Sequence, residues 1–294
     1  MRYRICGAYV FWNTYGEECV MIKIQNLIED TAANNGCLAE HGLSFYVETL
    51  NHKLLVDAGA SGKFMENAKK LNVNLKQVDT LILSHGHYDH SGGILPFASI
   101  NPTARIYIHE KAAGDYYSEK PDRTYYAGID KEIEKLPQTV KIKLDTVIDE
   151  ELYIFTNVTG RRHWPQGNSR LKKLVNGELV QDEFDHEQYL IINAKGKDIL
   201  MSGCAHNGIL NILDRYIELK GHEPDVIISG FHMMKSAEYT AEEIETIQQT
   251  AKELKKYKTK YYTGHCTGEP AFRMMKEVLG EQITYVRSGE SLEI

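Results

Sequence analysis

Four residues that can bind a metal ion lie within six consecutive positions of the chain. They are His85, His87, Asp89 and His90, and they follow an apolar run at 81–83 that is typical of a buried strand. An extended tripeptide places His85 and His87 on the same side, so both imidazoles can reach one cation. The turn that follows lets Asp89 and His90 face a neighbouring site. Imidazole and carboxylate donors favour Zn²⁺, Fe or Mn²⁺ over Mg²⁺ or Ca²⁺.

Three further apolar runs also end in Ser or Thr and lead into a loop with a histidine. They read ILMS-GCAH, VIIS-GFH and YYT-GHC, and they supply His206, His232 and His265. One isolated core histidine would explain any single run, but it explains four of them poorly. We therefore expect the strand ends to converge on one site, with His206 and His265 as further metal ligands. His232 could bind either metal or substrate, and Cys204 could be either a thiolate ligand or a buried neutral thiol.

Six short motifs resemble, in the same order, those of the metallo-β-lactamase superfamily. They are EHGLS at 40–44, LVDAG at 55–59, SHGHYDHSGG at 84–93, GCAHNG at 203–208, GFH at 230–232 and GHCTG at 264–268. The HxHxDH pattern is characteristic of the superfamily as a whole. GCAHNG with GHCTG is similar to one branch, named for 7,8-dihydropterin-6-methyl-4-(β-D-ribofuranosyl)aminobenzene 5′-phosphate synthase. The resemblance runs from about residue 21 to the C-terminus.

The resemblance implies the fold and the arrangement of the metal ligands. The expected fold is α/β (α+β), a single four-layer αββα sandwich over 21–294. The expected ligands are His85, His87 and His206 for a first metal, and Asp89, His90 and His265 for a second. Asp57 is expected to brace the metal loop, although an Asx-type turn at a strand end is the alternative. His41 is either a group facing the substrate or an ordinary loop histidine.

The sequence departs from the wider superfamily at two places. Relatives usually carry a ligand histidine in the turn that here contains His186, so His186 competes with His206 for the first metal. We expect His206 to be the ligand, because the turn at 182–187 is highly charged and such turns are normally solvated. Relatives with two metals usually bridge them by an Asp after Gly, where this chain has Cys204 after Gly203.

The activity implied by the resemblance is metal-dependent hydrolysis of a small, phosphorylated or heterocyclic metabolite. A metal-bound water, its pKa lowered to about 7, would attack the substrate, and Asp89 would orient or deprotonate that water. One or two divalent metals are expected, with Zn favoured and Fe or Mn as alternatives. A condensation with a diphosphate leaving group is the alternative reaction. A non-hydrolytic metal-dependent binding protein is the alternative outside catalysis.

Composition and single residues argue against several other classes. A diiron oxidoreductase of the flavodiiron type would normally carry Glu at the position of His87. A net charge of −7 and the lack of a basic stripe argue against a nucleic-acid partner. No apolar run approaches the roughly 20 residues of a membrane helix. Five cysteines without a C-x-x-C pair suit a reducing cytoplasm.

The elements that must position the site follow from periodicity and capping signals. Strands are expected at 21–27, 43–49, 53–57, 105–109, 189–193, 198–202 and 225–229, with a strand pair at 140–144 and 152–155. Helices are expected after caps at Ser61, Asn207 and Thr240, and from Pro270 to Gly280. Residues 110–185 form a tyrosine-rich insertion that either walls a pocket or forms a surface lid. Arg161 and Arg162 could grip a phosphate, or could simply be solvated. Residues 1–20 are expected to be a poorly packed extension.

Overall fold

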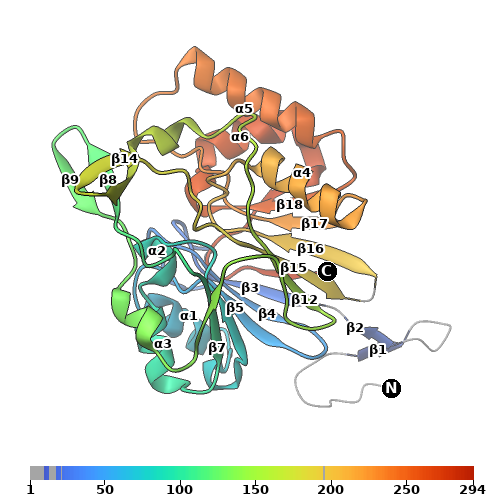
Figure 1. Cartoon of the computed structure of the whole chain (residues 1–294). Helices are drawn as coiled ribbons and strands as arrows, with labels where there is room; N and C mark the ends of the chain where they lie inside the picture. The colour runs from blue at the N-terminus through green and yellow to red at the C-terminus, as the bar shows by residue number, and fades with distance from the viewer. Residues whose placement is uncertain (1–9, 13–17, 21, 195) are drawn as a thin grey trace.

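The computed structural model describes residues 10–12, 18–20, 22–194 and 196–294, and most of them form a layered sandwich (Figure 1). One seven-stranded sheet has the order β10 (Thr139–Ile142), β7 (Arg105–His109), β6 (Thr80–Ile82), β5 (Lys53–Val56), β4 (Ser44–Glu48), β3 (Lys23–Ile28) and β20 (Ser291–Glu293). The other has the order β11 (Thr146–Val147), β12 (Leu152–Phe155), β15 (Tyr189–Ala194), β16 (Lys197–Met201), β17 (Val226–Ile228), β18 (Lys260–Thr263) and β19 (Ile283–Tyr285). Helices cover the outer faces: α1 (Lys63–Lys70) and α3 (Ile94–Ile100) on the first sheet, and α4 (Ile209–Lys220), α5 (Ala241–Leu254) and α6 (Glu269–Leu279) on the second.

Three hydrophobic cores lie between these four layers, which confirms the expected αββα architecture. In β5, Leu54 packs in the core between the two sheets, while Leu55 packs against the helices. In β16, Ile199 packs in the core between the two sheets, while Leu200 packs against the helices. Successive side chains of a strand point to opposite faces, so strands in the two middle layers must be apolar at nearly every position. This is why the sequence shows these strands as short continuous apolar runs.

The expected strand positions are confirmed to within one or two residues, but one predicted pairing is wrong. The runs at 140–144 and 152–155 do not pair with each other. β10 lies parallel to β7 in the first sheet, and β12 lies antiparallel to β15 in the second. Both runs alternate well enough to be strands, but their sequence separation is short and their partners are remote in sequence. Proximity in the chain therefore suggested a hairpin that does not form.

Helix starts were predicted with mixed success. Thr240 and Glu243 form the expected capping box at the start of α5, and Pro270 and Gly280 lie at the two ends of α6. Ser61 and Asn207 are not caps: Gly62 and Gly208 occupy the N-cap positions of α1 and α4. The Ser61 hydroxyl donates to Glu40 instead, and the Asn207 amide donates to Phe184 O and to Glu187.

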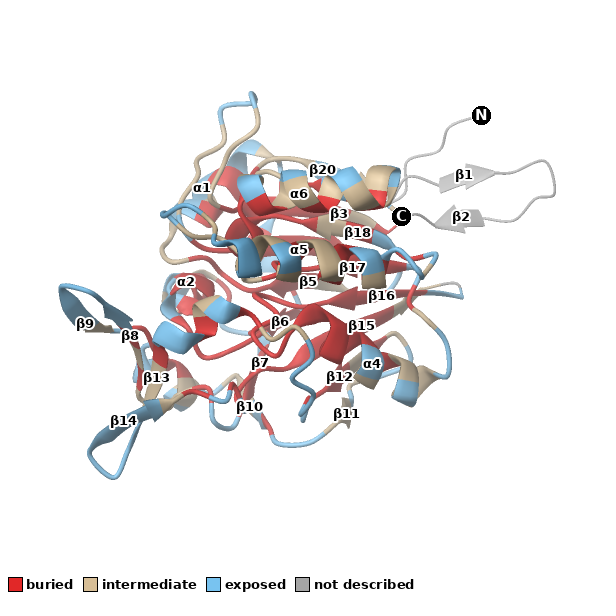
Figure 2. Cartoon of the chain, turned by 90° about the horizontal axis from the view of Figure 1, so that it is seen from above, coloured by how far each residue is buried: buried red, intermediate tan, exposed pale blue. Residues whose placement is uncertain are grey.

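Part of the tyrosine-rich insertion forms a separate four-stranded sheet. Its order is β14 (Glu178–Gln181), β13 (Leu171–Val175), β8 (Tyr116–Lys120) and β9 (Arg123–Tyr126). Two hairpins of this sheet project from the body and are largely exposed, whereas the two main sheets are buried (Figure 2). The base of the insertion is different, because Tyr116 is buried there and packs 4.1 Å from the ring of His186. The insertion thus contributes both a surface projection and part of the site wall.

The start of the chain is described only in part. Of residues 1–20 the structure describes two strands, β1 (Val10–Trp12) and β2 (Glu18–Val20), which pair antiparallel. The expectation of a poorly packed extension otherwise lies outside the described residues, and it stays a prediction. Within the residues that the structure describes, no helix is long and apolar enough to cross a membrane.

Candidate metal centre

The four histidine-bearing loops converge at one edge of the sandwich. β16, β17 and β18 are adjacent and parallel, so their carboxyl ends lie at the same edge of the second sheet. The loop after β6 reaches the same place from the first sheet, and there it forms the short helix α2 (Tyr88–Ser91). The carboxyl ends of parallel strands are the usual position of ligand sites in α/β sheets. The convergence expected from the sequence is therefore present.

A first group consists of three buried histidines, His85, His87 and His206. Their ring centroids lie 4.6–4.9 Å apart, and one ligand nitrogen from each lies within 4.8 Å of the others. The Nε2 atoms of all three are buried and have no hydrogen-bond partner in the described part of the chain. A buried polar atom without a partner is costly, so three facing one another indicate that a ligand belongs between them.

In His85 and His206, the opposite ring nitrogen is held by a neighbouring side chain. His85 Nδ1 lies 2.8 Å from Ser84 Oγ, and His206 Nδ1 lies 2.9 Å from Asn168 Oδ1. Asn168 also donates to the backbone oxygen of His206, which fixes the whole residue. Metal-binding histidines typically use the second nitrogen in this way, which sets the tautomer and the ring orientation.

The protonation states of this group also suit a metal. Burial lowers the pKa of His85 and His206, and neighbouring imidazoles lower it further. Burial, together with His186, lowers the pKa of His87 to about 3. Metal ligands must be deprotonated, and these three rings are neutral at any physiological pH.

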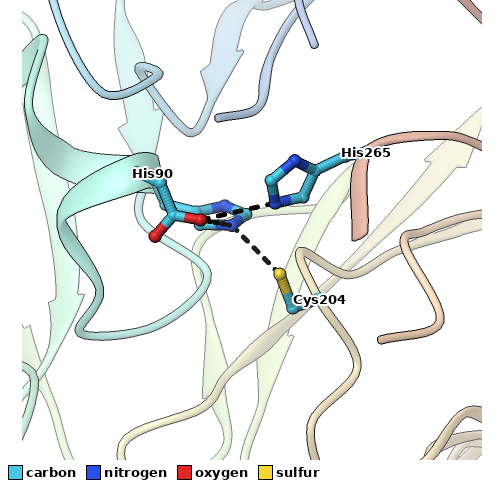
Figure 3. Close-up of side chains that lie close together, drawn as sticks. His90, Cys204 and His265 are labelled. Carbon is cyan, nitrogen blue, oxygen red and sulfur yellow. Dashed lines mark hydrogen bonds and ion pairs between the residues drawn. The ribbon is translucent and has the colours of Figure 1, made fainter. Parts of the chain in front are cut away.

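A second group comprises Asp89, His90, Cys204 and His265. Figure 3 shows His90, Cys204 and His265 pointing toward one another from three separate segments of the chain. Asp89 Oδ2 lies 3.7 Å from His90 Nε2 and 3.5 Å from His265 Nε2, and Cys204 Sγ lies 3.2 Å from His90 Nε2. Ligand atoms from all four lie within 4.8 Å of one another. The rings of His85 and His90 are 4.2 Å apart, so the two groups adjoin.

The charges of the second group also favour a cation. Burial would raise the pKa of Asp89, but His90 and His265 outweigh it, so the carboxylate stays ionised. Burial would lower the pKa of His265, but its hydrogen bond to Asp30 and the Asp89 carboxylate 3.5 Å from its Nε2 outweigh burial and raise that pKa. A positive charge is therefore favoured between these carboxylates, and a metal ion at His265 Nε2 would supply it. Burial raises the pKa of Cys204, so without a cation its thiol is neutral.

Three buried carboxylates accept hydrogen bonds from the loops that carry the histidines. Asp57 accepts from Ser84 N and Ser84 Oγ at 2.7 Å, and lies 2.6 Å from His90 Nδ1. This contact is the brace expected of Asp57. Glu187 accepts from the backbone N–H of His206 at 2.7 Å, and Glu29 from that of His265 at 2.9 Å. Each distal histidine loop thus has its own carboxylate, and the sequence analysis identified neither glutamate.

His186 adjoins the first group but both of its ring nitrogens are engaged. Nδ1 accepts from Gly86 N at 2.9 Å, and Nε2 lies 3.1 Å from Asp182 Oδ2. The expectation that the 182–187 turn is solvated is wrong, because His186 and Asp182 are fully buried. The ring supports the metal loop through Gly86, while His206 occupies the place beside His85 and His87.

The other candidate residues lie around the rim of the site. His232 lies 4.2 Å from the His206 ring, and both of its ring nitrogens are buried without a partner among the described residues. His41 is half exposed, and its Nε2 lies 3.5 Å from Asp89 Oδ2. Asp30, not anticipated from the sequence, contacts Nδ1 of both His41 and His265.

The two arginines considered for phosphate binding are engaged elsewhere. Arg161 pairs with Glu183, and Arg162 pairs with Asp214 and Glu253. Both pairs are on the surface, so neither guanidinium is free to grip an anion.

The residues present fit one or two divalent transition-metal ions. The first group offers three neutral imidazoles, and the second offers a carboxylate, two imidazoles and a thiol. Nitrogen, oxygen and sulfur donors of this kind suit Zn, Fe or Mn, whereas Mg²⁺ and Ca²⁺ prefer oxygen.

Comparison with known proteins identifies the family to which this fold belongs. A profile of the metallo-β-lactamase superfamily matches residues 39–166. The chain is 30% identical to 7,8-dihydropterin-6-methyl-4-(β-D-ribofuranosyl)-aminobenzene-5′-phosphate synthase of Methanocaldococcus jannaschii, over 92% of this chain and 96% of that protein. A solved structure described as a metal-dependent hydrolase of the β-lactamase superfamily is also 30% identical; the match covers 93% of this chain and 99% of that one, with a TM-score of 0.76. Zn²⁺-bound PqqB from Methylobacterium extorquens shares the fold at 14% identity over 92% of this chain and all of that one, with a TM-score of 0.54.

Proposed function

Since the chain belongs to the metallo-β-lactamase superfamily, we propose that it is a metal-dependent hydrolase of a small anionic metabolite, phosphorylated or heterocyclic in kind. The observation that carries this proposal is a set of four buried Nε2 atoms beside the ionised Asp89 that have no hydrogen-bond partner among the described residues, those of His85, His87, His206 and His265. Burying polar atoms without hydrogen bonds costs free energy, and a bound cation would offset that cost.

In this proposal, His85, His87 and His206 hold the first metal, and Asp89, His90 and His265 hold the second, with Cys204 as an additional donor. Zinc is favoured because the donors are mainly nitrogen with one sulfur. When bound, such ions lower the pKa of a water and stabilise negative charge on the substrate oxygen.

The remaining chemistry belongs to side chains of this chain. Asp89 Oδ2 accepts a hydrogen bond from the attacking water and can take its proton. His41 has a pKa raised by its hydrogen bond to Asp30, and its half-exposed ring can donate to an anionic substrate at the mouth of the site. His232 has two ring nitrogens without a hydrogen-bond partner among the described residues, and it can bind a substrate oxygen. We propose a small-molecule substrate and no nucleic-acid partner, in keeping with the net charge of −7.

A panel of substrates tests the proposal. Protein loaded in turn with Zn, Mn and Fe should hydrolyse at least one of a phosphomonoester, a phosphodiester, a lactone and a thioester. Activity should disappear with a chelator and return when metal is added. Failure of every loaded form on every class would contradict the proposal, as would hydrolysis that the chelator does not affect.

A second candidate reaction is a condensation with a diphosphate leaving group. It is favoured by the 30% identity with the synthase over nearly the whole chain. The same protein would then release diphosphate only when an aromatic amine or similar acceptor is present, whereas a hydrolase needs water alone.

A further inference from the structure

An apolar cavity of about 230 Å³ lies beside the metal-type clusters. It is enclosed by the segment around the 3-10 helix η3 (Gln166–Arg170), by residues 231–239 and by α5. Its apolar lining includes Ile209, Leu210, Phe231, Met233, Tyr239 and Ile247. Ile209, Leu210, Phe231 and Ile247 also belong to the buried core of the second sheet, so the cavity borders that core.

The cavity adjoins the cleft over the metal ligands. His232, Met234 and Arg170 line both, and the cleft also contains His87, Asp89 and His206. His232 stands at the junction with both ring nitrogens unpartnered among the residues described. A Cβ at Gly167 would lie 3.2 Å from His232 Nε2, so glycine at this position keeps the nitrogen from being crowded. A molecule held at the metals can therefore extend past His232 into the cavity.

Two basic side chains, Lys235 and Arg170, lie at this junction, and only Lys235 has an ion-pair partner among the described residues. Lys235 also lines the cavity, but Glu243 neutralises it at 2.7 Å. Arg170 lines the cavity, the cleft and the outer surface next to them, and its exposed guanidinium has no hydrogen bond or ion pair within the described ranges. A planar guanidinium binds phosphate or carboxylate oxygens in a bidentate manner.

We infer that the substrate is an anion with an attached aromatic group, whose flat apolar part fills this cavity while its anionic group lies between Arg170 and the metal ligands. The inference rests on the proposed function, and it names the substrate class. The size agrees, because an apolar cavity of about 150 Å³ accommodates benzene, so one substituted ring or a small fused ring system fits here. The lining agrees as well, since ligand pockets are mainly apolar with a few placed polar groups.

Binding of two phosphonates tests the inference without requiring catalysis. Phenylphosphonate and methylphosphonate are titrated calorimetrically into the metal-loaded protein at one pH. The ring of the first should enter the cavity and make it bind about 30-fold more tightly than the second. Thr246→Phe narrows the cavity from α5, and Ser169→Phe narrows it from the η3 wall. Either substitution should reduce the preference to less than about threefold.

Two further variants test the effect of the cavity and the effect of the Arg170 charge separately. Glu245→Phe places the same bulk on an exposed position of α5 that does not line the cavity, and it should keep the full preference. Arg170→Gln should weaken both phosphonates by a similar factor, roughly tenfold, and leave their ratio unchanged.

Several outcomes would overturn the inference. Equal affinity of the two phosphonates for the wild-type protein would do so, as would a preference that survives in both cavity variants. Absence of binding by either phosphonate would also overturn it, because the anionic group would then lie elsewhere. Hydrolysis of a purely aliphatic ester by the same metal-loaded protein would leave the proposed function standing in each of these cases.

Discussion

Replacing His87 by Ala should lower hydrolysis by at least about 1000-fold and remove about one metal ion per chain. His87 contributes one of the three neutral nitrogens of the first group, and its ring makes no hydrogen bond to another side chain in the described part of the chain. Its removal takes away a ligand without leaving a buried partner unsatisfied. The metal-free forms of the variant and the wild type should therefore unfold at nearly the same temperature.

His109→Ala is the matched control for this experiment. His109 is also a buried histidine at a strand end, but it belongs to none of the ligand groups. This variant should keep its metal content and its turnover within about threefold. Unchanged turnover in His87→Ala would refute the assigned centre, and equal losses in both variants would show that the effect is not specific to the ligands.

Asp57→Ala should lower the free energy of unfolding by about 3 kcal/mol, which corresponds to a fall of roughly 8 °C in Tm. Asp57 is completely buried, and its carboxylate satisfies Ser84 N, Ser84 Oγ and His90 Nδ1. Alanine leaves all three without a partner in the interior. Its φ of 62° adds to the loss, because Ala tolerates the left-handed region poorly.

Asp57→Asn separates the structural effect from the effect on the metal. Asn tolerates a positive φ and can still accept from Ser84 N, so it should cost only about 1 kcal/mol. Its amide nitrogen, which replaces the second carboxylate oxygen, cannot accept a hydrogen bond from His90 Nδ1. The affinity for the second metal should therefore fall about 10–100-fold. Thermal unfolding and metal titration of both variants check these values. A stable Asp57→Ala protein with unchanged metal affinity would contradict the role of Asp57 as a brace.

The positions of the candidate ligands could be predicted because they depend on local sequence pattern. A short apolar run followed by a polar loop defines a buried strand and its exit, and four such exits carry histidine. The place of His206 beside His85 and His87 followed from this pattern. The same signal was present where it was not used, since Glu29 and Asp30 directly follow the end of β3.

Contacts that depend on remote partners could not be predicted. Asn207 has the sequence context of a helix cap, yet Glu187 and Phe184 take its amide. His186 lies in a turn that looks solvated, and only the packing of Tyr116 and the 182–187 turn against the metal loop buries it. The sequence also does not show which arginine lacks a partner. Arg161 and Arg162 are paired with carboxylates, whereas the guanidinium of Arg170 has no partner among the described residues. Each of these outcomes is decided by tertiary contacts, which override local propensity.

Elemental analysis of the purified protein is the most direct test of the central claim. After expression in metal-replete medium, the protein should carry between one and two Zn, Fe or Mn ions per chain. The His87→Ala protein, prepared in parallel, should carry about one fewer. A wild-type protein that contains no transition metal under these conditions would contradict the account of His85, His87, Asp89, His90, His206 and His265 as a metal centre.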